Sequence, residues 1–177
     1  MDQITLGSGC FWCLEPIFQE LSGVMSVKSG YSGGKIENPT YDDICTGTTG
    51  HAEVIQVEFN PTIITLKDLL YVFFHMHDPT TLNSQGNDVG TQYRSAIFYN
   101  SNEQKKIAQD YIVEITNQGL YQDVIVTEVS ELKEFYIAED YHQDFYNRNK
   151  TYPYCRIIID PKIQKFKEEI KSKFGKI

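Results

Sequence analysis

Apolar residues along the chain follow two patterns, one typical of helices and one typical of strands. Leu14, Ile17, Phe18 and Leu21 have the i, i+3, i+4, i+7 spacing of one helix face, and Gly23 follows as a stop signal. Runs rich in β-branched and aromatic residues predict strands at 3–6, 24–31, 53–59, 94–99 and 124–129.

Capping signals predict where three further helices begin. Thr65 precedes one apolar helix face, and Ser101 forms a capping box with Gln104 ahead of another. Asp160 and Pro161 open a C-terminal helix, because proline is well tolerated at the first helical position. This mixture of helices and strands predicts an α/β or α+β fold. Since no repeat or linker interrupts the chain, we expect a single domain over 1–177.

Three long stretches show neither the helical nor the strand pattern of apolar residues: 32–51, 79–93 and 139–154. They are rich in Gly, Asn, Asp and Tyr. Long loops inside a compact domain are usually functional or disordered. Because these loops carry several aromatic residues, we interpret them as functional.

The charge balance narrows the class of protein. The net charge is −8, which argues against binding to nucleic acids or to anionic membranes. The chain has neither a signal-peptide pattern nor an apolar run of membrane-spanning length, so a cytoplasmic location is expected. In that reducing compartment, cysteines are more often catalytic or ligating than paired in structural disulfides. The four cysteines are Cys10, Cys13, Cys45 and Cys155.

Cys10 is the strongest candidate nucleophile. It follows a predicted strand and Gly9, and it begins the first predicted helix, with Pro16 taken to lie near the first turn. Unpaired N–H groups and the partial positive charge at a helix N-terminus stabilise a thiolate, the reactive form of cysteine. Cys13 lies three residues further on, where it could form a disulfide with Cys10.

Other interpretations of this cysteine remain open. Cys10 could be a buried, inert thiol. It could also bind zinc with Cys13, although Cys45 and Cys155 have no nearby partner at metal-binding spacing. The neighbouring Phe11 and Trp12 could line a pocket for a methyl or thioether group, or they could be ordinary core residues.

Glu53 is a candidate general acid. Side chains alternate between the two faces of a strand, so Glu53 shares the apolar face of Ile55 and Val57, whereas Glu58 lies on the other face. Burial would raise the pKa of the Glu53 carboxyl and favour its protonated form. The alternative is that the strand starts one residue later and that Glu53 is solvated.

Six sequence blocks, in order, resemble the A-type peptide methionine sulfoxide reductases along nearly the whole chain. The blocks are Gly9-Cys10-Phe11-Trp12, the Ser29–Gly34 segment with Asn38-Pro39-Thr40-Tyr41, Thr49-Gly50-His51-Ala52-Glu53, His77-Asp78-Pro79-Thr80, the segment 85–95, and Ala138-Glu139-Asp140-Tyr141-His142-Gln143. The resemblance implies a two-layer domain around a mixed sheet flanked by helices. It also implies a reductase of the S epimer of methionine sulfoxide, free or in proteins, that needs no metal or organic cofactor.

The resemblance also assigns roles to single residues. Cys10 is the nucleophile and becomes a sulfenic acid, and Glu53 is the proton donor to the sulfoxide oxygen. Tyr41 and Tyr93 supply hydroxyls that hold this oxygen. The positions that match substrate contacts are Phe11 and Trp12 for the methyl group, and Asp88 and His142 near the substrate backbone.

The resolving thiol is where the chain departs from the family pattern. Many members have Gly at the position of Cys13. Cys155 resembles the family's C-terminal resolving cysteine and is slightly favoured as the first resolver over Cys13. A relay that ends in a Cys13–Cys155 bridge is a further alternative. We expect Cys45 to pack as a small apolar group.

The resemblance further implies that thioredoxin reduces the enzyme, and we expect a monomer. Two rival functions stay open at this point. One is a general disulfide oxidoreductase that uses Cys10 and Cys13. The other is a non-catalytic module that binds oxidised peptides.

Overall fold

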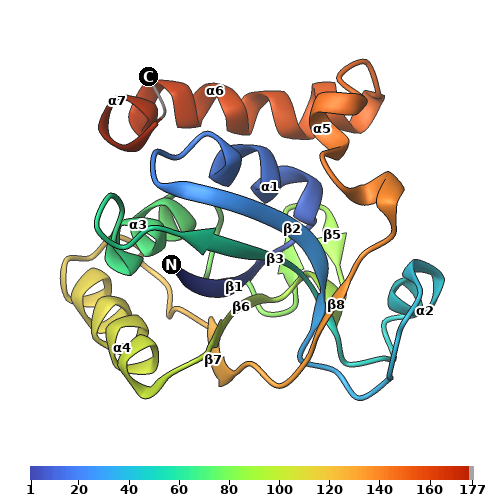
Figure 1. Ribbon diagram of the computed structural model, residues 1–177, viewed down its shortest axis with the longest axis horizontal. Helices are drawn as coiled ribbons and strands as arrows, with labels where there is room; N and C mark the ends of the chain where they lie inside the picture. Colours follow the sequence, from blue (N-terminus) through green and yellow to red (C-terminus); the bar gives the residue numbers. More distant parts are fainter. Residues whose placement is uncertain (176–177) are drawn as a thin grey trace.

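A six-stranded sheet forms the centre of the computed structural model, which describes residues 1–175 (Figure 1). Its strand order is β7-β6-β1-β3-β2-β8. Only the β6–β7 pairing is parallel, so the sheet is mixed, as expected. The strands are β1 (Asp2–Ser8), β2 (Val24–Ser32), β3 (Ala52–Phe59), β6 (Ser95–Tyr99), β7 (Glu128–Glu131) and β8 (Phe135–Ile137).

The helices and the short elements lie between and after these strands. The α-helices are α1 (Phe11–Gln19), α2 (Tyr41–Cys45), α3 (Leu66–His75), α4 (Asn102–Asn117), α5 (Phe145–Arg148), α6 (Asp160–Glu169) and α7 (Lys171–Phe174). The short elements are β4 (Ser84–Gln85), β5 (Asp88–Val89), the 3-10 turns η1 (Thr91–Tyr93) and η2 (Asp140–His142), and the π-helical turn η3 (Cys155–Ile159).

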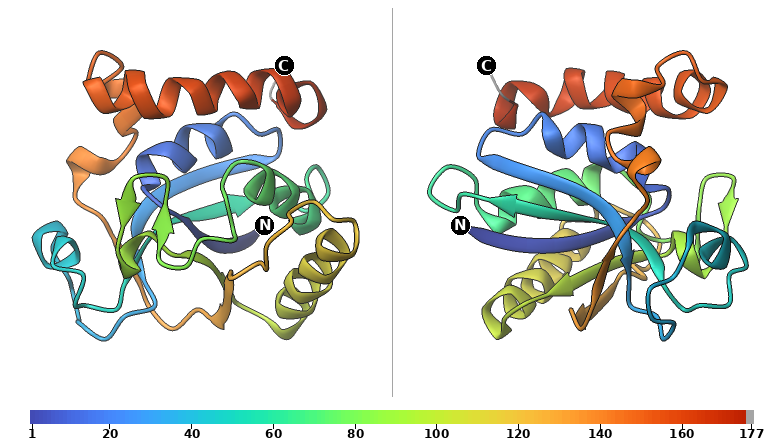
Figure 2. Two further views of the ribbon diagram at one scale, coloured as in Figure 1. Left: turned by 180° about the vertical axis from the view of Figure 1, so that it is seen from behind. Right: turned by 45° about the vertical axis from the view of Figure 1, so that its right-hand side comes forward.

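The helices cover one face of the sheet. Helix α1 lies directly on β2 and β3, and α6 crosses on the outer side of α1, while α3 and α4 pack together at the other end (Figures 1 and 2). Ile55, Val57 and Phe59 of β3 are completely buried in the core under these helices, together with Phe18 of α1. Their burial confirms the predicted apolar face of this strand.

The sheet is curled, because its two edge strands follow one another in the chain. Only residues 132–134 join β7 at one edge to β8 at the other. Leu132 and Phe135 therefore pack against Val54 and Phe98 on the face of the sheet that the helices leave uncovered. The observed architecture confirms the predicted mixed α/β fold.

Several predicted bounds of strands and helices are wrong. No strand covers 124–127, where Val124 is largely exposed, and β7 begins only at Glu128. Strand β8 is missed, because three residues are too few to show alternation. Pro16 lies inside α1 rather than in its first turn. The helical turn at the C-terminal end begins before Asp160, with the π-helical residues from Cys155 onward.

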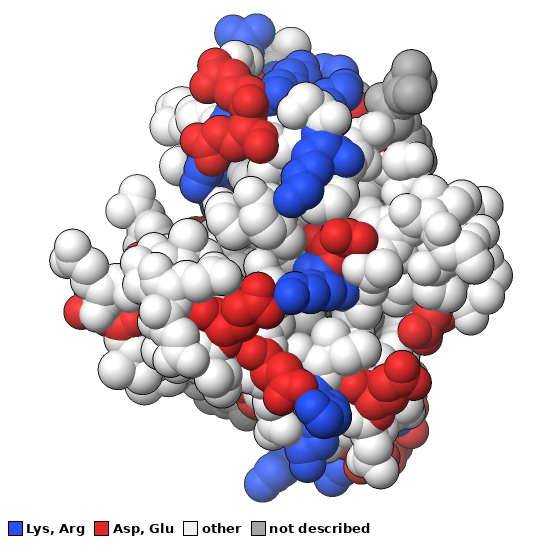
Figure 3. Space-filling model, turned by 90° about the vertical axis from the view of Figure 1, so that its left-hand side faces the viewer, with Lys and Arg blue, Asp and Glu red and all other residues white. Residues whose placement is uncertain are grey.

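Opposite charges are interspersed on the face of the molecule in Figure 3. Lys67 pairs with Glu114, and Lys171 pairs with Glu20. Blue and red side chains are mixed on the face shown, so no broad basic surface appears there. In the described part of the chain, none of the helices combines the length and apolar character that a bilayer crossing needs.

Candidate active site

Cys10 occupies the N-cap of α1, as the sequence predicts. β1 ends at Ser8, and Gly9 turns the chain with a φ of +93°. A Cβ atom on Gly9 would also lie 2.8 Å from the side chain of Gln85, so only glycine fits this turn. The turn leaves the Cys10 thiol half-buried at the end of the helix.

Glu53 lies beside the same helix end. Its Oε2 accepts a hydrogen bond of 3.2 Å from the backbone N–H of Phe11, and its side chain is 2% exposed. Burial raises the pKa of the Glu53 carboxyl to about 8, and the charge of Asp88 adds to the shift, whereas the Phe11 amide and the Cys10 thiol oppose it. The carboxyl is therefore protonated in most molecules at neutral pH and can act as an acid.

The thiols of Cys10 and Cys13 share a hydrogen bond, and their pKa values move in opposite directions. The bond from Cys10 lowers the pKa of Cys13 to about 7. Burial raises the pKa of Cys10 well above its ordinary value, and the bond to Cys13 and the carboxylate of Glu53 raise it further. The helix N-terminus therefore does not by itself lower the pKa of Cys10 below its ordinary value. The Trp12 amide does lower the pKa of Cys10, but burial outweighs it.

The hydroxyls of Tyr41 and Tyr93 lie near this carboxyl, although their elements, α2 and η1, are far apart in sequence. Burial raises the pKa of both phenols, and the charge of Glu53 is the second cause in each case. Both hydroxyls therefore remain protonated at neutral pH and can donate hydrogen bonds.

Aromatic rings form one wall next to Cys10. The Trp12 ring stacks on Phe145 with centroids 3.7 Å apart and an interplanar angle of 6°. Phe11 is almost completely buried and packs against Tyr31 and His142. Trp12 is half-buried, so part of its ring remains accessible at the site.

The structure places His142 behind this wall and not at the surface. The side chain is fully buried, and its Nδ1 accepts a hydrogen bond of 3.0 Å from the Trp12 indole N–H. The expected contact of His142 with a substrate backbone therefore does not fit this geometry, and the ring instead orients Trp12.

Asp88 stands at the rim of the site, on the β4–β5 hairpin. Its Oδ2 accepts a hydrogen bond of 3.0 Å from the Tyr154 hydroxyl, which also lies 3.8 Å from the sulfur of Cys13. Asp88 is half-buried and lies close enough to raise the pKa of Glu53. Sequence reasoning missed Tyr154, although its place next to Cys155 could have pointed to it.

All four cysteines are free thiols. Cys155 is completely buried and packs in one apolar cluster with Cys13, with Cys10 at the cluster's edge. Cys45, in contrast, is exposed at the end of α2, where its thiol approaches the Tyr41 hydroxyl. The expectation that Cys45 packs as an apolar residue is wrong, because its helix has only five residues and buries Ile44 instead.

Glu139 is a second site residue that sequence reasoning did not single out. Its Oε1 accepts a hydrogen bond from the Tyr31 hydroxyl, and its Oε2 accepts one from the backbone N–H of Tyr41, each at 3.0 Å. The carboxylate therefore fixes the start of α2, which carries Tyr41, relative to β2. Glu139 stands in one of the sequence blocks of the family resemblance, which was the available signal.

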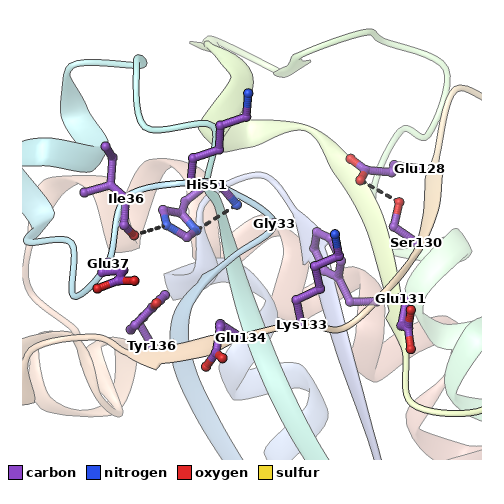
Figure 4. Close-up of a pocket in the computed structure, with 13 residues that line it drawn as sticks. Gly33, Ile36, Glu37, His51, Glu128, Ser130, Glu131, Lys133, Glu134 and Tyr136 are labelled. Atoms are coloured by element: carbon purple, nitrogen blue, oxygen red, sulfur yellow. Dashed lines mark hydrogen bonds between the residues drawn. The ribbon is translucent and has the colours of Figure 1, made fainter.

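A hollow of about 440 Å³ lies elsewhere, where the curled sheet nearly closes between the start of β3 and the β7–β8 connection (Figure 4). His51, Tyr136 and Glu134 line it, and none of the candidate active-site residues named above does. Within residues 1–175, His, Cys, Asp and Glu side chains do not gather in threes in a way that could hold a metal ion.

Comparison with known proteins gives one consistent result. The sequence profile of the family described as "Peptide methionine sulfoxide reductase" matches residues 2–174. The chain is 55% identical to peptide methionine sulfoxide reductase MsrA of Sulfolobus acidocaldarius, over 98% of this chain and 97% of that protein.

Solved structures agree with the sequence comparison. The crystal structure of Mxr1 from Saccharomyces cerevisiae in reduced form superimposes with a TM-score of 0.80 and 37% identity, and covers 87% of this chain and 88% of that one. Mxr1 in complex with Trx2 superimposes with a TM-score of 0.57 and 30% identity, over 81% of this chain and 84% of that one.

Proposed function

The chain belongs to the peptide methionine sulfoxide reductase family and is a thiol-dependent reductase of methionine sulfoxide, and we propose that Cys10 and Glu53 carry out its chemical step. One observation supports this assignment above the others. A buried carboxyl with a pKa of about 8 accepts a hydrogen bond from the residue that directly follows the Cys10 thiol. The nucleophile and the acid thus lie beside the same turn of α1.

In the proposed first step, the sulfur of Cys10 attacks the sulfoxide sulfur. The Cys13 thiolate, which already holds a hydrogen bond from Cys10, takes up the Cys10 proton. The protonated Glu53 gives its proton to the sulfoxide oxygen, because this oxygen is a poor leaving group while it carries negative charge. The new sulfur–sulfur bond and the sulfoxide S–O bond then break as the protonated oxygen passes to the sulfur of Cys10. The products are a thioether and a sulfenic acid on Cys10, so the sulfoxide is reduced and the thiol is oxidised by two electrons.

The remaining residues of the site bind the substrate in this proposal. The hydroxyls of Tyr41 and Tyr93 donate hydrogen bonds to the sulfoxide oxygen. Phe11 and Trp12 hold the methyl group, and the S epimer is the proposed substrate. Asp88 stays at the rim, where the peptide on either side of an oxidised methionine would pass.

We propose that Cys13 resolves the sulfenic acid first. Its thiol already contacts that of Cys10, whereas Cys155 packs against Cys13. These contacts shift the preference away from Cys155 as first resolver. Attack of Cys13 on the sulfenic acid forms a Cys10–Cys13 disulfide and releases water. Exchange with the Cys155 thiol then forms a Cys13–Cys155 bridge and frees Cys10. Thioredoxin is the dithiol that reduces the final disulfide.

Peptide mapping after one turnover tests this order. With Cys155→Ser, a Cys10–Cys13 disulfide should accumulate within the first turnover. With Cys13→Ser, the sulfenic acid on Cys10 should persist for longer before any disulfide forms. A Cys10–Cys155 disulfide that forms at the full rate in Cys13→Ser would contradict the order. Cys45→Ser is the control, because Cys45 lies on α2, outside the cluster of Cys13 and Cys155.

A turnover assay with separated epimers tests the reaction as a whole. We expect the S epimer of methionine sulfoxide to be converted with dithiothreitol or thioredoxin, and the R epimer to be left. Full turnover by Cys10→Ser would contradict the assignment of the nucleophile. Reduction of insulin without sulfoxide turnover would instead indicate a general disulfide oxidoreductase.

The setting of the enzyme is also part of this proposal. Oxidised methionine in proteins, as well as the free amino acid, is the proposed substrate, so the enzyme repairs oxidised proteins. Activity as a monomer is part of the proposal. A cytoplasmic location is proposed as well, because a reducing compartment supplies the reductant that this thiol chemistry needs.

A further inference from the structure

Glu15 is a buried carboxyl that the chemical step does not use. It lies on α1, and its side chain is 1% exposed. Its Oε1 accepts a hydrogen bond of 3.0 Å from the backbone N–H of Asp144. Burial of a carboxyl is unfavourable unless hydrogen bonds compensate for the lost water, so this contact is the main compensation that the fold offers.

The partner of Glu15 has an unusual backbone conformation. Asp144 has φ +52° and ψ 34°, in the left-handed region that residues other than glycine adopt rarely. It stands between the η2 turn and α5, where the chain changes direction. The hydrogen bond to Glu15 therefore stabilises the backbone at the residue of this segment that has the rarest conformation.

The residues on both sides of Asp144 contact the same ring. His142 accepts the hydrogen bond from the Trp12 indole, and Phe145 stacks on the face of that indole. Between them, the Gln143 side chain bonds to both the N–H and the carbonyl of Ser29 in β2, at 3.0 and 2.9 Å. Segment 142–145 thus contacts the Trp12 ring at its indole N–H and on one face. The same segment is hydrogen-bonded to β2 and to α1.

Glu15 and Trp12 are three residues apart on one helix, so they project from the same side of α1. The distance between the anchor and the ring is therefore set by rigid helix geometry. We propose that Glu15 is a positioning residue that fixes segment 142–145 against Trp12 and so sets the shape of the pocket for the methyl group of the substrate. The inference rests on the proposed function only for the identity of the group that this pocket binds.

Trp12 is the only tryptophan, so its fluorescence reports directly on this contact. Glu15→Leu keeps the volume but removes the acceptor, whereas Glu15→Gln keeps a carbonyl oxygen that can accept the Asp144 N–H. The matched control is Glu20→Gln at the end of the same helix, where the exposed carboxylate pairs with Lys171. All three variants are to be compared with the wild-type enzyme by acrylamide quenching of Trp12 and by steady-state kinetics.

We expect Glu15→Leu to increase the quenching constant of Trp12 about twofold. It should raise KM for a sulfoxide peptide about tenfold and change kcat less, as expected from the loss of one buried hydrogen bond. Glu15→Gln and Glu20→Gln should behave like the wild-type enzyme in both measurements. A folded Glu15→Leu protein with unchanged quenching and unchanged KM would overturn the inference. So would a Glu15→Gln protein as impaired as Glu15→Leu.

Two further results keep this test separate from the proposed function. If Cys10→Ser retained turnover, the assignment of the nucleophile would fail, but the quenching difference between Glu15→Leu and Glu15→Gln would remain. If Glu15→Leu does not fold, hydrogen exchange in the wild-type protein replaces it. The Asp144 amide should exchange as slowly as amides in the middle of β2, and exchange as fast as in exposed loops would overturn the inference.

Discussion

The backbone N–H of Phe11 donates a hydrogen bond of 3.2 Å to Oε2 of Glu53, a residue 42 positions further along the chain. This bond joins the first turn of α1 to the second residue of β3. The bond fixes the position of the Glu53 carboxyl relative to the residue that follows Cys10, and it does so through a direct contact between a helix and a strand. Because both elements pack in the core, the geometry exists before any substrate binds.

Glu53→Gln should slow the sulfoxide step by about 10²–10⁴-fold, the range that a positioned proton donor contributes. The amide can still accept the Phe11 N–H but cannot give a proton to the sulfoxide oxygen. Single-turnover release of methionine measures this step. Alkylation of Cys10 should remain possible. Glu58→Gln on the outer face of the same strand is the control and should keep the wild-type rate. An unchanged rate in Glu53→Gln would remove Glu53 from its role.

The same substitution should stabilise the protein at alkaline pH. The Glu53 pKa is about 8 in the folded state and near 4.5 when unfolded. Between these values the folded protein binds more protons, so its stability falls as pH rises through this window. Glu53→Gln should escape this loss, which is on the order of a few kcal/mol. Urea unfolding at pH 5 and at pH 8.5 measures it. An equal difference between wild type and variant at both pH values would contradict the raised pKa.

The shared hydrogen bond between the two thiols predicts a change in titration. Cys10→Ala removes the bond that lowers the pKa of Cys13, so the pKa of Cys13 should rise from about 7 toward the ordinary value of about 9. Thiolate absorbance at 240 nm follows this change, with Cys45 and Cys155 replaced by Ser in both proteins. A Cys13 pKa that stays near 7 in Cys10→Ala would show that another group stabilises the thiolate.

Helices α2 and α3 begin with the same type of cap, so substitutions at the two caps allow an effect on activity to be told apart from an effect on stability. Thr40 and Thr65 each accept a hydrogen bond from a backbone N–H of their own helix, at 3.2 and 3.1 Å. Replacing either with Ala should cost about 1 kcal/mol of helix stability. Only Thr40→Ala should lower kcat/KM, by roughly fivefold, because its helix begins with Tyr41. Equal kcat/KM values in the two variants would argue against a role for Tyr41.

The sequence predicts those parts of the site that depend on local pattern. Strand alternation places Glu53 on the buried face, and the glycines before Cys10 place it at a helix start. The pKa values of the thiols could not be predicted in this way. They depend on how closely Glu53 and Cys13 approach Cys10, and this is a result of packing between distant segments.

The C-terminal part of the site shows the same limit. Segment 139–154 has no periodicity, yet it supplies Glu139, His142, Phe145 and Tyr154 to the site. Their positions follow from contacts with α1 and β2, among them the bond between Glu15 and Asp144. Such contacts join residues more than a hundred positions apart, so one sequence shows that the loop is unusual but not where its side chains lie.

Trapping of the oxidised intermediate tests the central claim most directly. The variant with Cys13→Ser, Cys45→Ser and Cys155→Ser leaves Cys10 as the only thiol. Treated with methionine-S-sulfoxide and then with dimedone, it should yield methionine and a dimedone adduct on Cys10 in equal amounts. The rate should be lower than in the wild-type enzyme, because the Cys13 proton acceptor is missing, and it should fall further with Glu53→Gln. Methionine release without an adduct on Cys10 would contradict the account.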